Sequence, residues 1–311
     1  RVYNATLFIF KGDDETSATY ESAYKMNVTN FNKVPDNNQC TTEGIVSSKV
    51  TKPTLTGTQK LFAYVIINDN GLADIANNTL GGTAYTTATT FPTFSKIVLN
   101  NIGGIESPYN GLVMTNAPVA NYAGGATDPD ASVTTKTLSF LDENKIFTTE
   151  AAAQATPAAE IYMERAAAKV TVALSSSMVA NPGISADPSV KFDKASIKWT
   201  LSNVNSTYYN TRQMKNDWLH YVADGSDGTP NSATQYRFIS GTAIHTGVYR
   251  TYWGVDVNYT GNSGLTSAPG ILDKLASDGT SVYTFANTFN VENQSVKNAT
   301  GIDISATSNE G

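Results

Sequence analysis

Cysteine, histidine and charged residues are all scarce in this chain of 311 residues. The single cysteine, Cys40, excludes an internal disulfide, so stability has to come from buried apolar surface and strand pairing. His220 and His245 are the two histidines, and neither has the paired spacing of a zinc site. Charged residues make up 15% of the chain and the net charge is −6, which disfavours nucleic acid as a partner. No apolar run approaches the roughly 20 residues that a membrane-spanning helix needs.

The acidic residues offer few arrangements that suit catalysis or metal binding. The densest pairs are Asp128 with Asp130 and Asp224 with Asp227. Both pairs lie in loop-like sequence, so solvated turns explain them better than two facing catalytic carboxylates do. The second pair also lacks the full ligand series of a calcium loop. We therefore expect no catalytic residue, no metal and no cofactor. A secreted hydrolase stays the third functional hypothesis, behind the two described below.

Four aromatic residues close together in the sequence carry the second functional hypothesis. They are Tyr249, Tyr252, Trp253 and Tyr259. Flat rings of this kind can bind a sugar, so the chain could be a secreted carbohydrate-binding β-sandwich. The same rings are expected in a strand or a packed loop, where they bury apolar surface. Loss of glycan binding in a Trp253→Ala variant would favour the sugar-binding hypothesis.

The abundant residues are those of β-sheets and of the turns between strands. Thr and Tyr suit a pleated surface, whereas Asn, Gly and Asp suit turns. Residues 2–10 (VYNATLFIF) are apolar on both faces of a predicted strand, and residues 60–68 (KLFAYVIIN) have a continuous apolar core. Cover on two sides is implied, so we predict a central strand at 60–68. Further strands are predicted at residues 24–31, 133–147, 190–204, 236–239, 281–285 and 302–306.

The predicted helices are few and short. Residues 72–80 place apolar side chains near helical spacing before two glycines. Residues 94–102 predict another one or two helical turns. The Ala-rich residues 150–160 predict either a helical turn, whose length Pro157 would limit, or a linker. Residues 271–277 predict a helix between a proline and a glycine. The sequence therefore predicts a mainly-β protein with a few short helices.

The chain divides best at a segment that has two prolines and little periodicity. Residues 162–174 form one predicted strand, after which residues 175–189 lose the pattern. We predict an N-terminal domain over residues 1–178, a linker over 179–189 and a C-terminal domain over 190–311. Two β-sandwich-like domains are the simplest architecture for such a chain.

Five stretches resemble one protein family in the same order along the chain. They are RVYNATLFIFKGDD (1–14), QKLFAYVIINDNGLADI (59–75), GLVMTNAPV (111–119), MERAAAKVTVAL (163–174) and YTFANTFNVENQ (283–294). Together they resemble the fimbrillins, the type V pilin subunits of Bacteroidales, including the FimA-like and minor-fimbria shaft subunits. The resemblance extends over about 290 residues, because the five stretches run from the first strand almost to the end of the sequence.

The resemblance implies a pilin with two transthyretin-like Greek-key domains at the cell surface, in a fimbrium of the outer membrane. It implies export as a lipoprotein precursor and removal of an N-terminal segment by an Arg- or Lys-specific protease. Subunits of this kind polymerise by inserting a strand of one copy into a groove of the next. The chain would then be a structural shaft subunit rather than an enzyme, with other pilin subunits and host or bacterial receptors as partners. Further C-terminal strands, including the donor strand, are expected beyond residue 311.

The residues predicted to line the acceptor groove are Leu7, Ile9, Val170 and Val172. They belong to predicted strands with apolar residues on both faces. A missing neighbour beside such strands would leave unpaired backbone groups and exposed apolar surface. A donated strand would cover both, so we expect a Val170→Asp variant to polymerise poorly.

Overall fold

The computed structural model describes residues 2–28, 34–35, 42–100, 111–121, 134–173, 196–205, 207–214, 239–251, 254–257, 272–277, 281–285 and 300–307. Within these residues the chain is mainly β, with antiparallel sheets and only short helices, which confirms the predicted fold class at this level. No helix in the described part of the chain is long and apolar enough to cross a membrane.

The strands group into two compact units, and each unit is assembled from two segments of the chain. Unit 1 comprises residues 1–166 and 209–254, and unit 2 comprises residues 167–208 and 255–311. The linker predicted at residues 179–189 lies outside the described residues, so that boundary stays a prediction.

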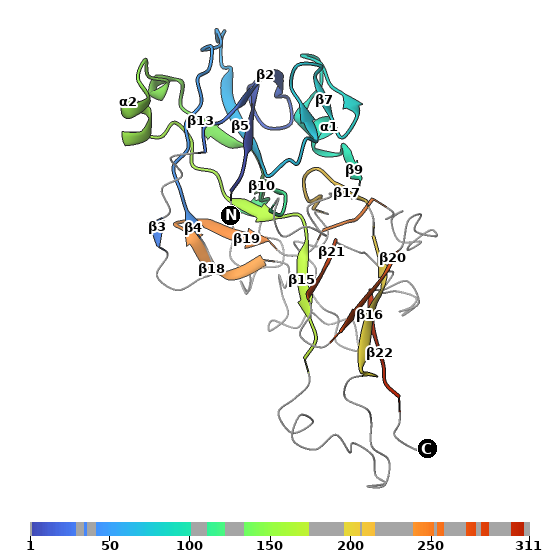
Figure 1. Ribbon diagram of the computed structural model, residues 1–311. Coiled ribbons are helices and arrows are strands. Elements are labelled where there is room, and N and C mark those ends of the chain that lie inside the picture. The colour runs from blue at the N-terminus through green and yellow to red at the C-terminus, as the bar shows by residue number, and fades with distance from the viewer. Residues whose placement is uncertain are drawn as a thin grey trace, which may run out of the picture. The chain divides into compact units, whose positions relative to one another are not determined.

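Unit 1 is built on a six-stranded antiparallel sheet whose central strand is β5 (Figure 1). Its strands are β1 (Ala5–Gly12), β2 (Thr19–Lys25), β5 (Lys60–Ile67), β10 (Met114–Asn116), β13 (Ser139–Leu141) and β14 (Met163–Arg165). β5 pairs with β1 along its whole length, and β2 pairs with the far edge of β1. The other edge of β5 pairs with β10 and β13, and β14 follows β10. The predicted central strand at residues 60–68 is therefore confirmed.

The remaining elements of unit 1 are short. They are β3 (Val34–Pro35), β4 (Thr42–Glu43), β6 (Ala73–Asp74), β7 (Thr79–Leu80), β8 (Thr83–Ala84), α1 (Phe91–Ser95), β9 (Val98–Asn100), β11 (Val119–Ala120), β12 (Thr135–Lys136), the 3₁₀ helix η1 (Glu143–Lys145), α2 (Glu150–Ala155), β18 (Ile239–His245) and β19 (Val248–Thr251). Strands β12, β11, β19 and β18 form a second sheet in that order, so the later segment of unit 1 pairs with the earlier one.

One face of the main sheet carries an aromatic core. Phe8 and Phe10 of β1 and Tyr64 of β5 are completely buried. The ring of Phe94 in α1 lies 5.1 Å from that of Phe8 and 5.2 Å from that of Phe10, between centroids. Tilted and edge-to-face packing of this kind adds to the free energy of apolar burial. The apolar character of β1 and β5 on this face is thus explained by cover from the chain itself.

The helix predicted at residues 72–80 is wrong, because this segment forms the small meander β6, β7 and β8. The backbone is in the left-handed region at Asn78 within this segment, and at Asn70, Gly71 and Gly81 on either side of it. A right-handed helix cannot contain such residues, and Asn and Gly are the residues that adopt this conformation in turns. The turn residues therefore outweigh the helical spacing of the apolar side chains.

Three other predicted elements also need correction. Residues 162–174 form two strands, because the chain bends after β14 and leaves unit 1 before β15 (Ala168–Thr171). Residues 271–277 form the strand β20 (Leu272–Ser277), whose antiparallel pairing with β16 overrides local helix propensity. Of residues 94–102, the structure describes 94–100, which contain the end of α1 and then β9. At residues 150–160, the helical turn rather than the linker is confirmed by α2.

The described residues of unit 2 form two small antiparallel sheets. The first has the order β20-β16-β22, where β16 spans Lys198–Val204 and β22 spans Gly301–Ser305 (Figure 1). The second pairs β15 with β21 (Ser281–Thr284). The strands predicted at residues 281–285 and 302–306 are confirmed. After β16, the chain passes back to unit 1 through β17 (Thr207–Tyr209).

Candidate functional site

Leu7 and Ile9, the predicted groove residues of β1, are buried within one copy of the chain. They are 7% and 0% exposed, and β1 is paired along both of its edges. Partly buried apolar side chains cover their face of the sheet, among them Leu55, Ile146 and Ile161. Both side chains therefore belong to the apolar core of unit 1.

Val170 and Val172, the other two predicted groove residues, lie in unit 2. Both are partly buried and pack against Trp199, Leu201 and Val204 of β16, which are almost completely buried. The sheet that contains β15 is thereby packed on the sheet that contains β16. The structure thus places the two valines together, but in a different unit from Leu7 and Ile9.

The apolar face of β16 continues onto β22, where it is exposed. The register of these strands pairs Trp199 with Ile304 and Leu201 with Ile302. Residues directly opposite each other in an antiparallel pair project on the same face of the sheet. Trp199 and Leu201 are each 1% exposed, yet Ile302 is 51% exposed and Ile304 is 65% exposed. The core of unit 2 therefore reaches the edge of its sheet without being covered there.

β22 also lacks the features that usually protect an edge strand. Its sequence, GIDIS, contains no lysine and no proline, and its one charged residue, Asp303, projects on the face opposite to the two isoleucines. Among the described strands, β16 alone pairs with β22, so one row of backbone N–H and C=O groups points away from the sheet. We call the backbone of β22 together with Ile302 and Ile304 the open edge.

The geometry of the open edge suits the addition of another β-strand. An added strand would pair with the outward backbone groups, and its side chains would cover the two isoleucines. The sequence predicted the strand but did not single out Ile302 and Ile304. Their alternation with Asp303 and Ser305 indicates one apolar face. Only the pairing of β22 with β16 reveals that this face lies at an edge.

Most residues of the other functional hypotheses lie outside the described residues. These are Tyr252, Trp253 and Tyr259 of the aromatic cluster, the acidic residues Asp128, Asp130, Asp224 and Asp227, and Cys40 and His220. Tyr249 is partly buried in β19, and His245 is exposed at the end of β18. The sugar-binding and hydrolase hypotheses therefore stay predictions.

Comparison of the sequence with models of known protein families found no match, and comparison with curated proteins also found none. The open edge and the five fimbrillin-like stretches are therefore the features of this chain that bear on its function.

Proposed function

We propose that this chain is a structural subunit, of the shaft type, of a cell-surface fimbrium. In this proposal a second copy adds a β-strand to the open edge of unit 2, and repeated addition forms the filament. The observation that carries the proposal is the exposure of Ile302 and Ile304 on the core face of an edge strand. The mainly-β fold and the five stretches that resemble fimbrillins support it.

The finer features of the fimbrillin family belong to the same proposal. Each unit would be a Greek-key β-sandwich, and an Arg- or Lys-specific protease would remove an N-terminal segment from the exported precursor. The assembled filament would lie at the outer membrane and support adhesion to host or bacterial receptors. The proposed role is structural and requires no catalytic residue.

The free energy of strand addition can be estimated from the exposed fractions of the two isoleucines. Complete burial of an isoleucine side chain is worth about 1.5–3 kcal/mol. With 51% of Ile302 and 65% of Ile304 still exposed, covering both would contribute about 2–3.5 kcal/mol. A micromolar complex requires about 8 kcal/mol, so the isoleucines alone are insufficient. The added strand has to supply backbone hydrogen bonds and apolar side chains of its own.

This shortfall defines the strand that fits. The pleat of a β-strand places alternate residues on one face, so the added strand needs apolar residues at every second position. A shift of the register by one residue would place its polar residues over Ile302 and Ile304. Because ordering a free strand costs about 1–2 kcal/mol per residue, a donor that is already extended would bind most tightly.

A charge placed on the open edge tests the proposal. We expect Ile304→Lys to prevent filament formation by the full-length, processed protein, because a lysine at this edge opposes strand pairing. The matched control is Ile244→Lys, since Ile244 is 36% exposed and lies on β18, the edge strand of a sheet in unit 1. Electron microscopy of both variants and of the wild type gives the result.

Circular dichroism of the monomers checks that the two variants fold like the wild type. The proposal predicts filaments from the wild type and from Ile244→Lys but none from a folded Ile304→Lys monomer. Normal filaments from Ile304→Lys would refute strand addition at the open edge.

A further inference from the structure

The polypeptide passes between the two units three times. It leaves unit 1 after Ala166, returns at Tyr209 and leaves again after Gly254. A residue of unit 1 lies close in sequence to each of these crossings. Glu164 lies near the first crossing, Arg212 near the second and Thr251 near the third.

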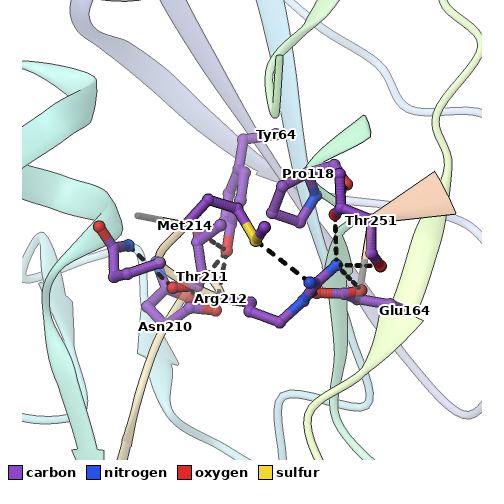
Figure 2. Close-up of polar contacts among 9 residues, drawn as sticks. Tyr64, Pro118, Glu164, Asn210, Thr211, Arg212, Met214 and Thr251 are labelled. Atoms are coloured by element: carbon purple, nitrogen blue, oxygen red, sulfur yellow. Dashed lines mark hydrogen bonds and ion pairs between the residues drawn. The ribbon is translucent and has the colours of Figure 1, made fainter. Parts of the chain in front are cut away.

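Arg212 binds the other two residues, Glu164 and Thr251, directly (Figure 2). Its Nε and Nη2 atoms donate hydrogen bonds to the two carboxylate oxygens of Glu164, both at 2.8 Å. Nη2 also donates to the backbone oxygen of Thr251 at 3.0 Å and to its hydroxyl at 2.8 Å. The side chains of Arg212 and Glu164 are only 17% and 25% exposed, so water screens this ion pair weakly. One guanidinium on the second crossing segment thus binds the first and the third.

The neighbours of Arg212 hold it in this position. Its Nη1 atom donates to the Met214 sulfur at 3.2 Å, and the Thr251 hydroxyl donates to the backbone oxygen of Pro118 (Figure 2). Gly254 lies against the aliphatic part of Arg212, because a Cβ atom there would be 2.5 Å from Arg212 Cγ and 2.9 Å from the backbone oxygen of Gln213. The third crossing segment is therefore in close contact with the second.

We propose that Arg212 is a clamp that makes the three crossing segments of unit 1 open and close as one cooperative event. The planar guanidinium suits this role, since its five donors lie in a fixed geometry that a lysine does not reproduce. Without the clamp, each crossing segment would be held only by its own strand pairing and would open independently. The inference concerns the single folded chain and does not depend on the proposed fimbrial role.

Two exposed arginines report on the clamp, because trypsin cleaves after them only when their strands open. Arg165 follows Glu164 in β14, and Arg250 precedes Thr251 in β19. In the full-length protein we expect Arg212→Lys to raise both cleavage rates, each by about 10- to 100-fold, the range for lost hydrogen bonds to charged groups. Cleavage after the exposed Lys49, in a loop of unit 1, is the internal control and should stay unchanged.

Faster cleavage at both Arg165 and Arg250 with an unchanged rate at Lys49 supports the clamp. Acceleration at one site alone, or at neither, overturns it, since the segments then open independently of Arg212. If cleavage at Lys49 rises as well, Arg212→Lys unfolds the whole unit. The milder variant Glu164→Gln then decides by the same comparison, because it preserves the side-chain shape and one acceptor oxygen.

Discussion

The hydroxyl of Tyr64 offers a quantitative test of how unit 1 is completed by the later part of the chain. Tyr64 lies in the middle of β5 and is completely buried. Its hydroxyl accepts a hydrogen bond from the Thr211 hydroxyl at 2.7 Å and lies within donor distance of the Asn210 side-chain oxygen, at 3.0 Å (Figure 2). Burial raises the pKa of this hydroxyl, so it stays a neutral donor at all ordinary pH values. The contact joins residues that are 146 and 147 positions apart.

The substitution Tyr64→Phe removes the hydroxyl and leaves both partners buried, since Asn210 is 1% exposed and Thr211 is 2% exposed. A buried polar group without its partner costs about 1–3 kcal/mol. For the two partners together we expect a loss of about 2–4 kcal/mol in the free energy of unfolding. In a unit of this size, 1 kcal/mol corresponds to about 2–4 °C, so the midpoint of thermal unfolding should fall by about 5–15 °C.

Thermal unfolding followed by circular dichroism measures this change. Tyr162→Phe is the matched control, because the Tyr162 hydroxyl donates to Glu160 in an exposed hydrogen bond and its loss should change the midpoint by less than about 2 °C. If Tyr64→Phe unfolds at the same temperature as Tyr162→Phe, the segment around Asn210 and Thr211 is not part of the core of unit 1.

Two further predictions concern the turn after β1. The carboxylate of Glu15 accepts hydrogen bonds from the backbone N–H groups of Thr137 and Leu138, but its burial outweighs them and raises its pKa above 4.5. The folded state then holds this proton more tightly than the unfolded state, so stability falls as pH rises from about 4.5 through the raised pKa. Urea unfolding at pH 5 and pH 7 should show a smaller pH effect in Glu15→Gln, and an identical effect in both proteins would contradict this assignment. The substitution Gly12→Ala would place a Cβ atom 2.6 Å from the backbone Cα of Ala18. We expect it to lower the free energy of unfolding, measured in urea, by about 1–3 kcal/mol. An unchanged urea midpoint would mean that the turn is not packed this closely.

The strands that were predicted best are those whose apolar pattern is strong and whose cover is local. Residues 60–68 predicted β5 and its central position, because a continuous apolar run requires neighbours on both faces. Residues 271–277 were predicted as a helix and form β20, since the ladder with β16 is a tertiary interaction that no local spacing contains. The sequence pattern predicts one strand over residues 162–174, although the chain bends within this segment and continues in another unit.

The open edge could be predicted only in part, for a related reason. Alternation of Ile302 and Ile304 with polar residues predicts a strand with one apolar face. Whether that strand is central or lies at an edge depends on its pairing with β16, about 100 residues earlier in the sequence. In contrast, Leu7 and Ile9 were predicted to line a groove from their apolar context alone, and the structure buries them under loops whose positions the sequence pattern does not reveal.

The clamp at Arg212 has no local signature in the sequence. Glu164 and Arg212 are separated by 48 residues, and Arg212 and Thr251 by 39 residues, so no motif spacing connects them. Their meeting follows from the three passages of the chain between the units, which only the fold reveals.

Hydrogen exchange at β22 tests most directly whether a second copy adds a strand to the open edge. In the folded monomer, the amides of Gly301–Ser305 that point away from β16 have no strand partner among the described residues, so they should exchange rapidly. In filaments of the processed protein, the same amides should exchange at least about 100-fold more slowly, while those of the β18 edge in unit 1 stay unchanged. Filaments in which the outward amides of β22 exchange as fast as in the monomer would contradict strand addition at this edge.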